Sequence, residues 1–398
     1  MPLGIYISVP FCKSKCSYCN FATGVVSRTA YSKYVDRVCQ DMAVAEATAQ
    51  AVGGKFERSV DSVFIGGGTP TILEAVDLER MFRALQENFE VVPGTEITVE
   101  CAPGTLTAEM LDMLVRCGVN RVSLGVQSWV DSEAAAVGRL HTRARVLEDI
   151  AALRAAGIED INVDLIAGLP HQTAESWAYS VSETVACGVP HASIYMLEVD
   201  EDSRLGRELL AGGAKYHAHF VPDEDLSAEF YGAACLRLEA AGIRQYEISN
   251  FACAGSESRH NLKYWDRKPY FGFGVDAHSM LLSVRPDLAA VRFAGPDNLN
   301  SFVASAPLGV TEISSEAAME EAFFLGLRLN RGVDLTAMAA EFGEPSAAAV
   351  KEVVDELVEY ALLERGDHHV RLTAQGRLLS NEVFEKFLGI AAVRSSRS

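Results

Sequence analysis

Three cysteines near the start of the chain constrain its fold and chemistry more than any other feature. Cys12, Cys16 and Cys19 form a Cys-x3-Cys-x2-Cys pattern directly after an alternating apolar run at residues 5–9, which predicts a β-strand that ends at Pro10. Thiolates bind iron–sulfur clusters, and a short loop after a strand turns three sulfurs toward one centre. Three protein ligands leave one iron of a four-iron cluster open. The pattern therefore predicts a [4Fe-4S] cluster with room for a further ligand.

Two other interpretations of these cysteines are weaker. Structural zinc sites usually have four protein ligands, whereas the next cysteine, Cys39, lies twenty residues downstream. The chain has nine cysteines, an odd number, and no export signal, which disfavours a disulfide framework. The six cysteines outside the triplet lie in apolar contexts and are expected to be buried small side chains.

A repeated strand–loop–helix unit fills the first half of the chain. Strands are predicted at residues 5–9, 60–65, 97–100, 121–127, 161–166 and 192–197, with helical patterns between them. Strands separated by single helices pair in parallel, so the sequence predicts an α/β fold, a partial (β/α)6 TIM-like barrel.

Polar residues stand near the C-terminal ends of these strands, the edge at which barrel enzymes place their sites. Glu100, Gln127 and Asp164 are such residues, and each taken alone is explained equally well as a helix cap or a satisfied barrel residue. Their shared position favours one pocket. The glycine run at residues 66–68 is more often a turn, but between a strand and a helix it also lets backbone N–H groups approach an anion.

Residues 286–398 have a different pattern. Helical segments precede a β-hairpin near residues 362–373, which predicts a small α+β, winged-helix-like domain. We therefore divide the chain into a barrel at residues 1–285, carrying the cluster and ligand sites, and a C-terminal domain at 286–398. The tail from residue 393 is expected to be disordered.

Composition limits the partners and the compartment. The net charge of −19 opposes binding to nucleic acid or to an anionic membrane. No apolar run long enough for a membrane helix and no cleavable signal are visible, so a cytoplasmic location is expected. In so acidic a chain, a winged-helix-like domain is expected to be a substrate cap or a partner surface.

A second informative stretch, residues 246–279, is rich in aromatic residues, histidine and glycine. It contains His260, Asn261, Tyr264 and Trp265. Neutral imidazole is a common ligand of haem iron, and flat rings suit a porphyrin face. From composition alone, a packed aromatic corner with hydrogen-bonded histidines is the favoured alternative.

The cysteine triplet resembles that of radical S-adenosylmethionine (SAM) enzymes. Tyr-Glu-Ile-Ser-Asn-Phe-Ala at residues 246–252, His-Asn-x-x-Tyr-Trp at 260–265 and Gly-x-Gly-x-x-Ala-His-Ser at 272–279 resemble the HemW-type haem chaperones, relatives of oxygen-independent coproporphyrinogen III oxidase. The resemblance implies a [4Fe-4S] cluster on the triplet, SAM on the open iron, and bound haem. It implies SAM contacts by Tyr6, Tyr18, Gly67, Gly68, Thr69, Glu100, Gln127, Arg139, Asp164 and Met196, with the Tyr18 ring available to a purine. It makes His260 the expected haem ligand, with Asn261, Tyr264 and Trp265 beside it.

Two departures disfavour the oxidase alternative. That family has a further cysteine two residues after the triplet, where this chain has Phe21, and a longer arm before the cluster. We expect a haem chaperone that passes haem to an unidentified acceptor protein, without coproporphyrinogen oxidase activity. Whether SAM is cleaved is left open. One departure from both groups is Asp276, where small residues are usual.

The expected partners are haem, the acceptor and an electron donor for the cluster, with membrane association only through the acceptor. The sequence leaves the oligomeric state open, with a homodimer among the alternatives.

Overall fold

A sheet of parallel strands forms the centre of the computed structural model, which describes residues 1–390 and, for residues 344–349, the backbone alone. The strands β1 to β6 lie side by side in chain order, and all of them run parallel. They are β1 (Leu3–Val9), β2 (Ser59–Gly67), β3 (Glu90–Cys101), β4 (Arg121–Gln127), β5 (Asp160–Ala167) and β6 (His191–Met196). The predicted six-stranded partial barrel is confirmed.

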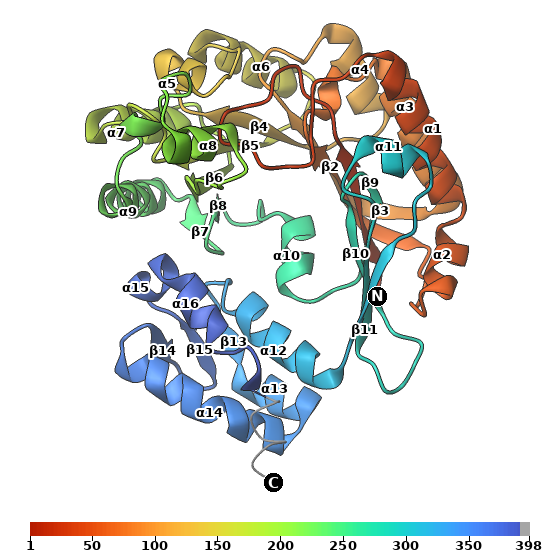
Figure 1. Ribbon diagram of the computed structural model, residues 1–398, viewed down its shortest axis with the longest axis vertical. Coiled ribbons are helices and arrows are strands. Elements are labelled where there is room, and N and C mark those ends of the chain that lie inside the picture. Colours follow the sequence, from red (N-terminus) through yellow and green to blue (C-terminus); the bar gives the residue numbers. More distant parts are fainter. Residues whose placement is uncertain (391–398) are drawn as a thin grey trace.

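Helices cover the outer, convex side of this sheet, and α10 (Arg259–Trp265) lies on the inner side (Figure 1). Apolar residues at helical spacing explain the packing. In α4 (Ala108–Arg116), for example, Met110, Met113 and Leu114 are buried. The other helices of this region are α1 (Thr29–Ala43), α2 (Ala45–Ala51), α3 (Ala75–Asn88), α5 (Asp131–Ala136), α6 (Arg143–Ala155), α7 (Ala174–Ala186), α8 (Arg204–Ala211) and α9 (Glu224–Ala240).

Further strands extend the sheet at both edges. At one edge, β8 (Asn250–Ala252) pairs antiparallel with β6, and β7 (Arg244–Gln245) follows it. At the other, β9 (Tyr270–Gly274) runs parallel to β1 and is followed by the antiparallel strands β10 (His278–Leu282), β11 (Ala290–Ala294) and β12 (Gly309–Ile313). The short helix α11 (Leu299–Val303) lies between the last two. The division at residue 285 stays a prediction, and β11 and β12, beyond it, are hydrogen-bonded into the large sheet.

The glycines of β9 allow this close pairing. A Cβ atom on Gly272 would lie 2.2 Å from the carbonyl oxygen of His278, and one on Gly274 would lie 2.4 Å from that of Ser8. Gly274 also has a φ of 107°, which a larger residue rarely adopts. The Gly-x-Gly pattern is therefore needed for β9 to fit between β1 and β10.

The C-terminal domain has its own core and a three-stranded sheet in the order β13-β15-β14. Its elements are α12 (Ser315–Gly326), β13 (Val333–Asp334), α13 (Leu335–Phe342), α14 (Glu344–Glu359), β14 (Leu363–Arg365), β15 (His369–Leu372), α15 (Ala374–Leu378) and α16 (Ser380–Glu385). The predicted winged-helix-like domain with its hairpin is confirmed, whereas the predicted disordered tail at 393–398 lies outside the described residues.

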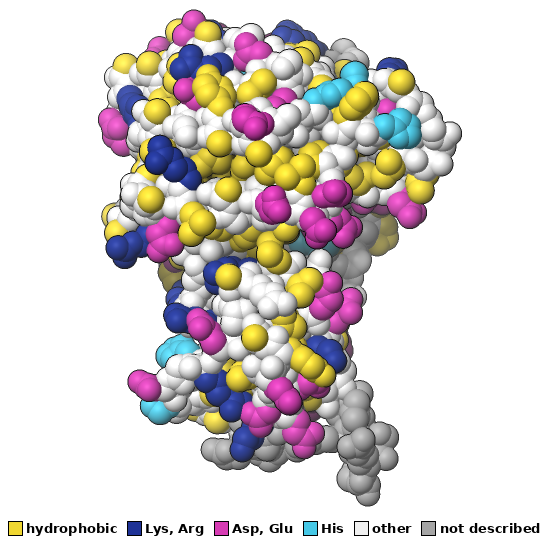
Figure 2. All heavy atoms as spheres, turned by 90° about the vertical axis from the view of Figure 1, so that its left-hand side faces the viewer, with side chains coloured by type: hydrophobic (Ala, Val, Ile, Leu, Met, Phe, Trp, Pro, Cys, Tyr) yellow, Lys and Arg dark blue, Asp and Glu magenta, His cyan; other side chains and the backbone are white. Residues whose placement is uncertain are grey.

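This domain is narrower than the barrel and lies below it in both views (Figures 1 and 2). The segment after α12 joins it to the barrel. The Ile248 N–H donates to the carbonyl oxygen of Arg328 at 3.1 Å, and the Asn330 N–H donates to that of Tyr246 at 3.0 Å. Within residues 1–390, no helix combines the length and the apolar character that a membrane crossing requires.

Candidate functional site

The cysteine loop, residues 11–28 between β1 and α1, carries three free thiols. Cys12, Cys16 and Cys19 all line one cavity of about 320 Å³, here called the cysteine cavity. The backbone fixes the loop at Ser17, whose N–H donates to the carbonyl oxygen of Val137 at 3.1 Å. Burial raises the pKa of Cys12, opposed by a hydrogen bond with Thr23. Three thiols around one cavity are a donor set that suits an iron–sulfur cluster.

A single metal ion has no comparable site in the described part of the chain. Among residues 1–390, no three His, Cys, Asp or Glu side chains converge closely enough to hold one ion. The three cysteines therefore line a cavity, and their thiols are not arranged as the ligands of a single ion.

The glycine loop after β2, residues 66–69, is hydrogen-bonded to the end of β1 and to the start of the cysteine loop. The Gly68 N–H donates to the carbonyl oxygen of Val9 at 2.8 Å, and the Thr69 N–H donates to that of Phe11 at 2.7 Å. A Cβ atom on Gly68 would lie 2.4 Å from the carbonyl oxygen of Phe11. Gly67, Gly68 and Thr69, which are predicted to contact SAM, line the cysteine cavity. Their backbone N–H groups, however, already donate hydrogen bonds to Glu100, Val9 and Phe11.

Two half-buried carboxyl groups, those of Glu100 and Asp164, line the same cavity as the thiols. Burial and the nearby Asp164 raise the pKa of Glu100 to about 8, although the Gly67 N–H donates to its Oε2 atom at 3.1 Å. Burial also raises the pKa of Asp164, which accepts hydrogen bonds from Ser123 Oγ at 3.0 Å and Asn162 Nδ2 at 2.7 Å. Two acids in one enclosed space favour a cationic ligand, because its charge offsets their repulsion. The sulfonium and ammonium groups of SAM have that charge.

Arg139, Gln127 and Tyr18 complete the predicted wall of the cysteine cavity. Arg139 extends from the turn after α5, and its Nη1 lies 3.7 Å from the Sγ atom of Cys16. Gln127 ends β4 with a left-handed backbone (φ 68°). Thr98, on β3, also faces this cavity, and its buried hydroxyl has no hydrogen-bond partner among the described residues. A bound ligand with polar groups would satisfy it.

Two predicted SAM contacts lie elsewhere. Tyr6 lines a neighbouring cavity of about 310 Å³, here called the aromatic cavity, whose wall includes Phe21, Tyr264, Tyr270 and His278. Met196 packs against the hydrophobic core and lines neither of these cavities in the part of the chain that the structure describes. Its neighbour Tyr195 lines the cysteine cavity in its place.

The deep end of the cysteine cavity holds a polar network that the sequence reasoning missed. His191 Nδ1 donates to Asn162 Oδ1 at 2.6 Å, and its Nε2 accepts from the Tyr246 hydroxyl at 3.0 Å. Burial, together with Arg121, lowers the pKa of His191, so the ring is neutral and one nitrogen is free to accept. Ser193 Oγ donates to Asn250 Oδ1 at 2.8 Å. The signal for this network was in the sequence, because polar residues alternate along otherwise apolar strands (Arg121-Ser123, Asn162-Asp164, His191-Ser193).

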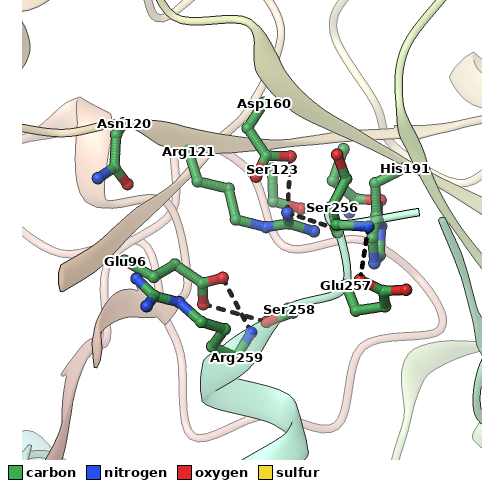
Figure 3. Close-up of polar contacts among 12 residues, drawn as sticks. Glu96, Asn120, Arg121, Ser123, Asp160, His191, Ser256, Glu257, Ser258 and Arg259 are labelled. Carbon is green, nitrogen blue, oxygen red and sulfur yellow. Dashed lines mark hydrogen bonds and ion pairs between the residues drawn. The ribbon is translucent and has the colours of Figure 1, made fainter. Parts of the chain in front are cut away.

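One ion pair and several hydrogen bonds join this end of the barrel to the start of α10 (Figure 3). Arg121 Nη1 donates to Asp160 at 2.7 Å and to the carbonyl oxygen of Ser256 at 2.9 Å. Glu96 accepts from the Arg259 N–H at 2.9 Å, at the helix N-terminus where a carboxylate is stabilising. The barrel thus holds α10 in a fixed position.

The predicted haem residues are dispersed. His260 is 1% exposed, and both of its ring nitrogens have partners: Nδ1 lies 3.0 Å from Ser62 Oγ and Nε2 lies 2.9 Å from the Tyr264 hydroxyl. Burial, and then Lys263, lower its pKa to about 3. Asn261 lines the cysteine cavity and Tyr264 the aromatic cavity.

Trp265 lines neither of these two cavities. The guanidinium carbon of Arg328 lies over the Trp265 ring, 4.3 Å from the ring centroid. The structure therefore does not bring the four predicted haem residues together, and in this conformation His260 offers no free nitrogen to an iron atom.

The comparisons with known proteins agree with this geometry. The radical SAM superfamily model matches residues 6–182, and the HemN C-terminal domain model matches residues 313–379. "Heme chaperone HemW" of Bacillus subtilis (strain 168) is 34% identical over 96% of this chain and 98% of its own length. "Heme chaperone HemW" of Mycobacterium tuberculosis (strain ATCC 25618 / H37Rv) is 31% identical over 98% of this chain and 95% of its own.

A solved structure has the same fold. The radical SAM enzyme coproporphyrinogen III oxidase (HemN) from Escherichia coli matches with a TM-score of 0.81 at 22% identity, over 97% of this chain and 90% of that one. At this identity the match speaks for the fold alone. Sequence and structure together lead to one family: the chain belongs to the radical SAM superfamily and, within it, to the HemW heme chaperone family.

Proposed function

We propose that this protein is a haem chaperone, which binds haem and passes it to an acceptor protein. The observation that carries the proposal is the likeness to HemW of Bacillus subtilis, which extends over 96% of this chain and 98% of that protein. Agreement over the full length means that the barrel, the aromatic stretch and the C-terminal domain are all shared.

Membership in the radical SAM superfamily implies a [4Fe-4S] cluster and SAM. We assign the cluster to Cys12, Cys16 and Cys19, since their thiols line the same cavity. The bound pair supplies one-electron chemistry. Glu100 and Asp164 would attract the cationic end of SAM, Arg139 would balance the thiolate charge, and Thr98 would offer its unpaired hydroxyl to the ligand.

The work of the protein is then to hold haem near the cysteine cavity and release it to a partner. An electron donor to the cluster and a cytoplasmic location belong to the same proposal. Whether SAM is cleaved during transfer is a separate question, and the oxidase reaction is the competing outcome of the test below.

The test uses the full chain, reconstituted with iron and sulfide without air. We expect hemin to bind in a saturable way with a shifted Soret band, and to move from the loaded protein to apomyoglobin, used as a substitute acceptor. The Cys12→Ala/Cys16→Ala/Cys19→Ala variant should lose its iron, whereas Cys117→Ala, on the outer side of the barrel, should retain it. Absence of a Soret shift, or rapid conversion of coproporphyrinogen III to protoporphyrinogen, would overturn the proposal.

A further inference from the structure

We propose that His278, rather than His260, ligates haem iron, and that haem binds in the aromatic cavity beside the cysteine loop. The inference rests on the proposed haem-chaperone function and names the site of binding. The predicted ligand, His260, is buried, and both of its ring nitrogens have hydrogen-bond partners.

His260 fails as a ligand on geometry. Its ring is enclosed, and each nitrogen has a hydrogen-bond partner, Ser62 on β2 and Tyr264 one turn along α10. Iron ligation would break one of these bonds and require α10 to leave the barrel, although Glu96 holds the first backbone N–H groups of that helix. Breaking either bond would leave a buried polar group without a partner, which is unfavourable.

His278 has the opposite environment. It begins β10, its side chain is 66% exposed, and it lines the aromatic cavity. No hydrogen bond from the described residues occupies either ring nitrogen. Its Nε2 lies 3.7 Å from Oδ1 of Asp276. A carboxylate next to a ligating histidine orients the ring and raises its basicity, which gives Asp276 a use in the site.

The turn before β10 fixes this histidine–carboxylate pair. Asp276 has a left-handed backbone (φ 54°), and its N–H donates to the carbonyl oxygen of Pro296 at 2.9 Å. The backbone therefore sets the position of Asp276, which lines the aromatic cavity together with His278.

Aromatic rings supply flat walls for a macrocycle. Tyr264 and Tyr270 meet edge to face with centroids 4.6 Å apart, and Tyr6 and Phe21 line the same space. His260 holds Tyr264 through its hydroxyl group. His260 is then a positioning residue, which explains how the His-Asn-x-x-Tyr-Trp segment serves haem binding without giving a ligand to iron.

Size and charge determine how haem would be oriented. The aromatic cavity, about 310 Å³, is at the small end of the range of about 300–1,000 Å³ for ligand sites. Its charged lining residues are Glu100 and Asp276, with no Lys or Arg among the described ones. The haem propionates therefore face water, and one edge of the ring enters. Phe21 and Gly67 also line the cysteine cavity, so the entering edge lies next to the cluster site.

The other histidines give the competing outcomes. His141 and His191 are buried and hydrogen-bonded, and the rings of His171 and His217 are hydrogen-bonded to each other at 3.2 Å. His219 is exposed in the turn Ala218–Phe220 and lines neither the cysteine cavity nor the aromatic cavity. His368 and His369 line a separate cavity of about 590 Å³ in the C-terminal domain, with Lys351 and Arg365. This cavity is the strongest alternative and forms an arm of the test.

The experiment is an anaerobic hemin titration of the reconstituted full chain, with the Soret band and the ligand-field spectrum as readouts. We expect His278→Ala to lose the imidazole-ligated spectrum and to bind hemin at least tenfold more weakly. In His278→Gly, added imidazole should restore the spectrum. His368→Ala/His369→Ala should behave as the wild type.

The positioning role of His260 has its own readout. His260→Ala should keep the imidazole-ligated spectrum with reduced affinity, Tyr264→Phe should reproduce that loss, and the double variant should lose no more than either single variant. Circular dichroism and iron content check that each variant is folded. A wild-type spectrum in His278→Ala, or its loss in folded His260→Ala or in His368→Ala/His369→Ala, overturns the assignment. Absence of hemin binding by the wild type overturns the proposed function itself.

Discussion

At the scale of single residues, burial decides which side chains of this barrel are available to a ligand. Glu100 and Asp164 are half-buried acids that face the same cavity, whereas His260 is fully buried and both of its ring nitrogens already have partners. Residue type suggested a role for all three of them. Their surroundings separate the acids, which face open space, from the histidine, which does not.

The raised pKa of Glu100 makes the SAM-free protein sensitive to pH. The folded carboxyl group titrates near 8, against an ordinary value of 4.5. The folded state therefore holds its proton more tightly, so this contribution to stability is complete below pH 4.5 and is lost as the pH rises toward 8. Glu100→Gln should remove roughly 3–5 kcal/mol of that pH dependence of the unfolding free energy. Urea denaturation at both ends of the range measures it, and Glu382→Gln, an exposed acid, should change nothing.

At the scale of elements, two loops that follow neighbouring strands hold each other in place. The backbone after β2 donates to Val9, the last residue of β1, and to Phe11 in the cysteine loop, and this contact leaves no space for a side chain at Gly68. The position of the three thiols thus depends on the glycine loop.

Gly68→Ala should displace the cysteine loop. The added methyl group meets a carbonyl oxygen, so we expect a loss of roughly 1–3 kcal/mol in unfolding free energy and less iron per chain after reconstitution. The matched control is Gly232→Ala in α9, where a Cβ atom meets nothing within 4 Å. That change should stabilise the protein by up to about 1 kcal/mol. Equal iron content in the two variants would contradict this role for the glycine loop.

The elements also show what the sequence could and could not predict. The cysteine loop and the parallel strands were predictable because short spacing and periodicity specify them. The SAM contact by Met196 stays a prediction from the family resemblance, whereas alternation along β6 puts His191, Ser193 and Tyr195 on the cavity side and Met196 against the core. The enclosure of His260 was not predictable, since its partner Ser62 is remote in the chain and meets it only in the folded barrel.

At the scale of the whole molecule, the C-terminal domain contacts the segment that forms the deep end of the cysteine cavity. Glu247 is fully buried and accepts from the Ser249 N–H at 3.0 Å, and its Oε2 lies 3.8 Å from Arg328. Burial raises the pKa of Glu247, and Arg328 opposes that rise. One ion pair therefore connects the domain to residues beside Tyr246 and Asn250, which belong to the polar network.

Removing this cation should destabilise the protein strongly. Arg328→Ala leaves the Glu247 carboxylate buried without its partner, for which we expect a loss of roughly 3–5 kcal/mol, larger at high pH because the acid is then ionised. The exposed pair of Arg331 with Asp266 is the control, and Arg331→Ala should cost roughly 0–1 kcal/mol. Equilibrium denaturation measures both. A similar loss of unfolding free energy in the two variants would show that the buried ion pair contributes no more to stability than the exposed one.

The central place of β1 in the sheet also governs the order of events during synthesis. This first strand pairs with β2 on one side, but on the other side Ile5 pairs with Phe271 of β9. As the chain leaves the ribosome, β1, which precedes the cysteine loop, stays paired on one side only until most of the protein has been made. We therefore expect the cysteine loop, which follows β1, to reach its final position only after β9 has been synthesised.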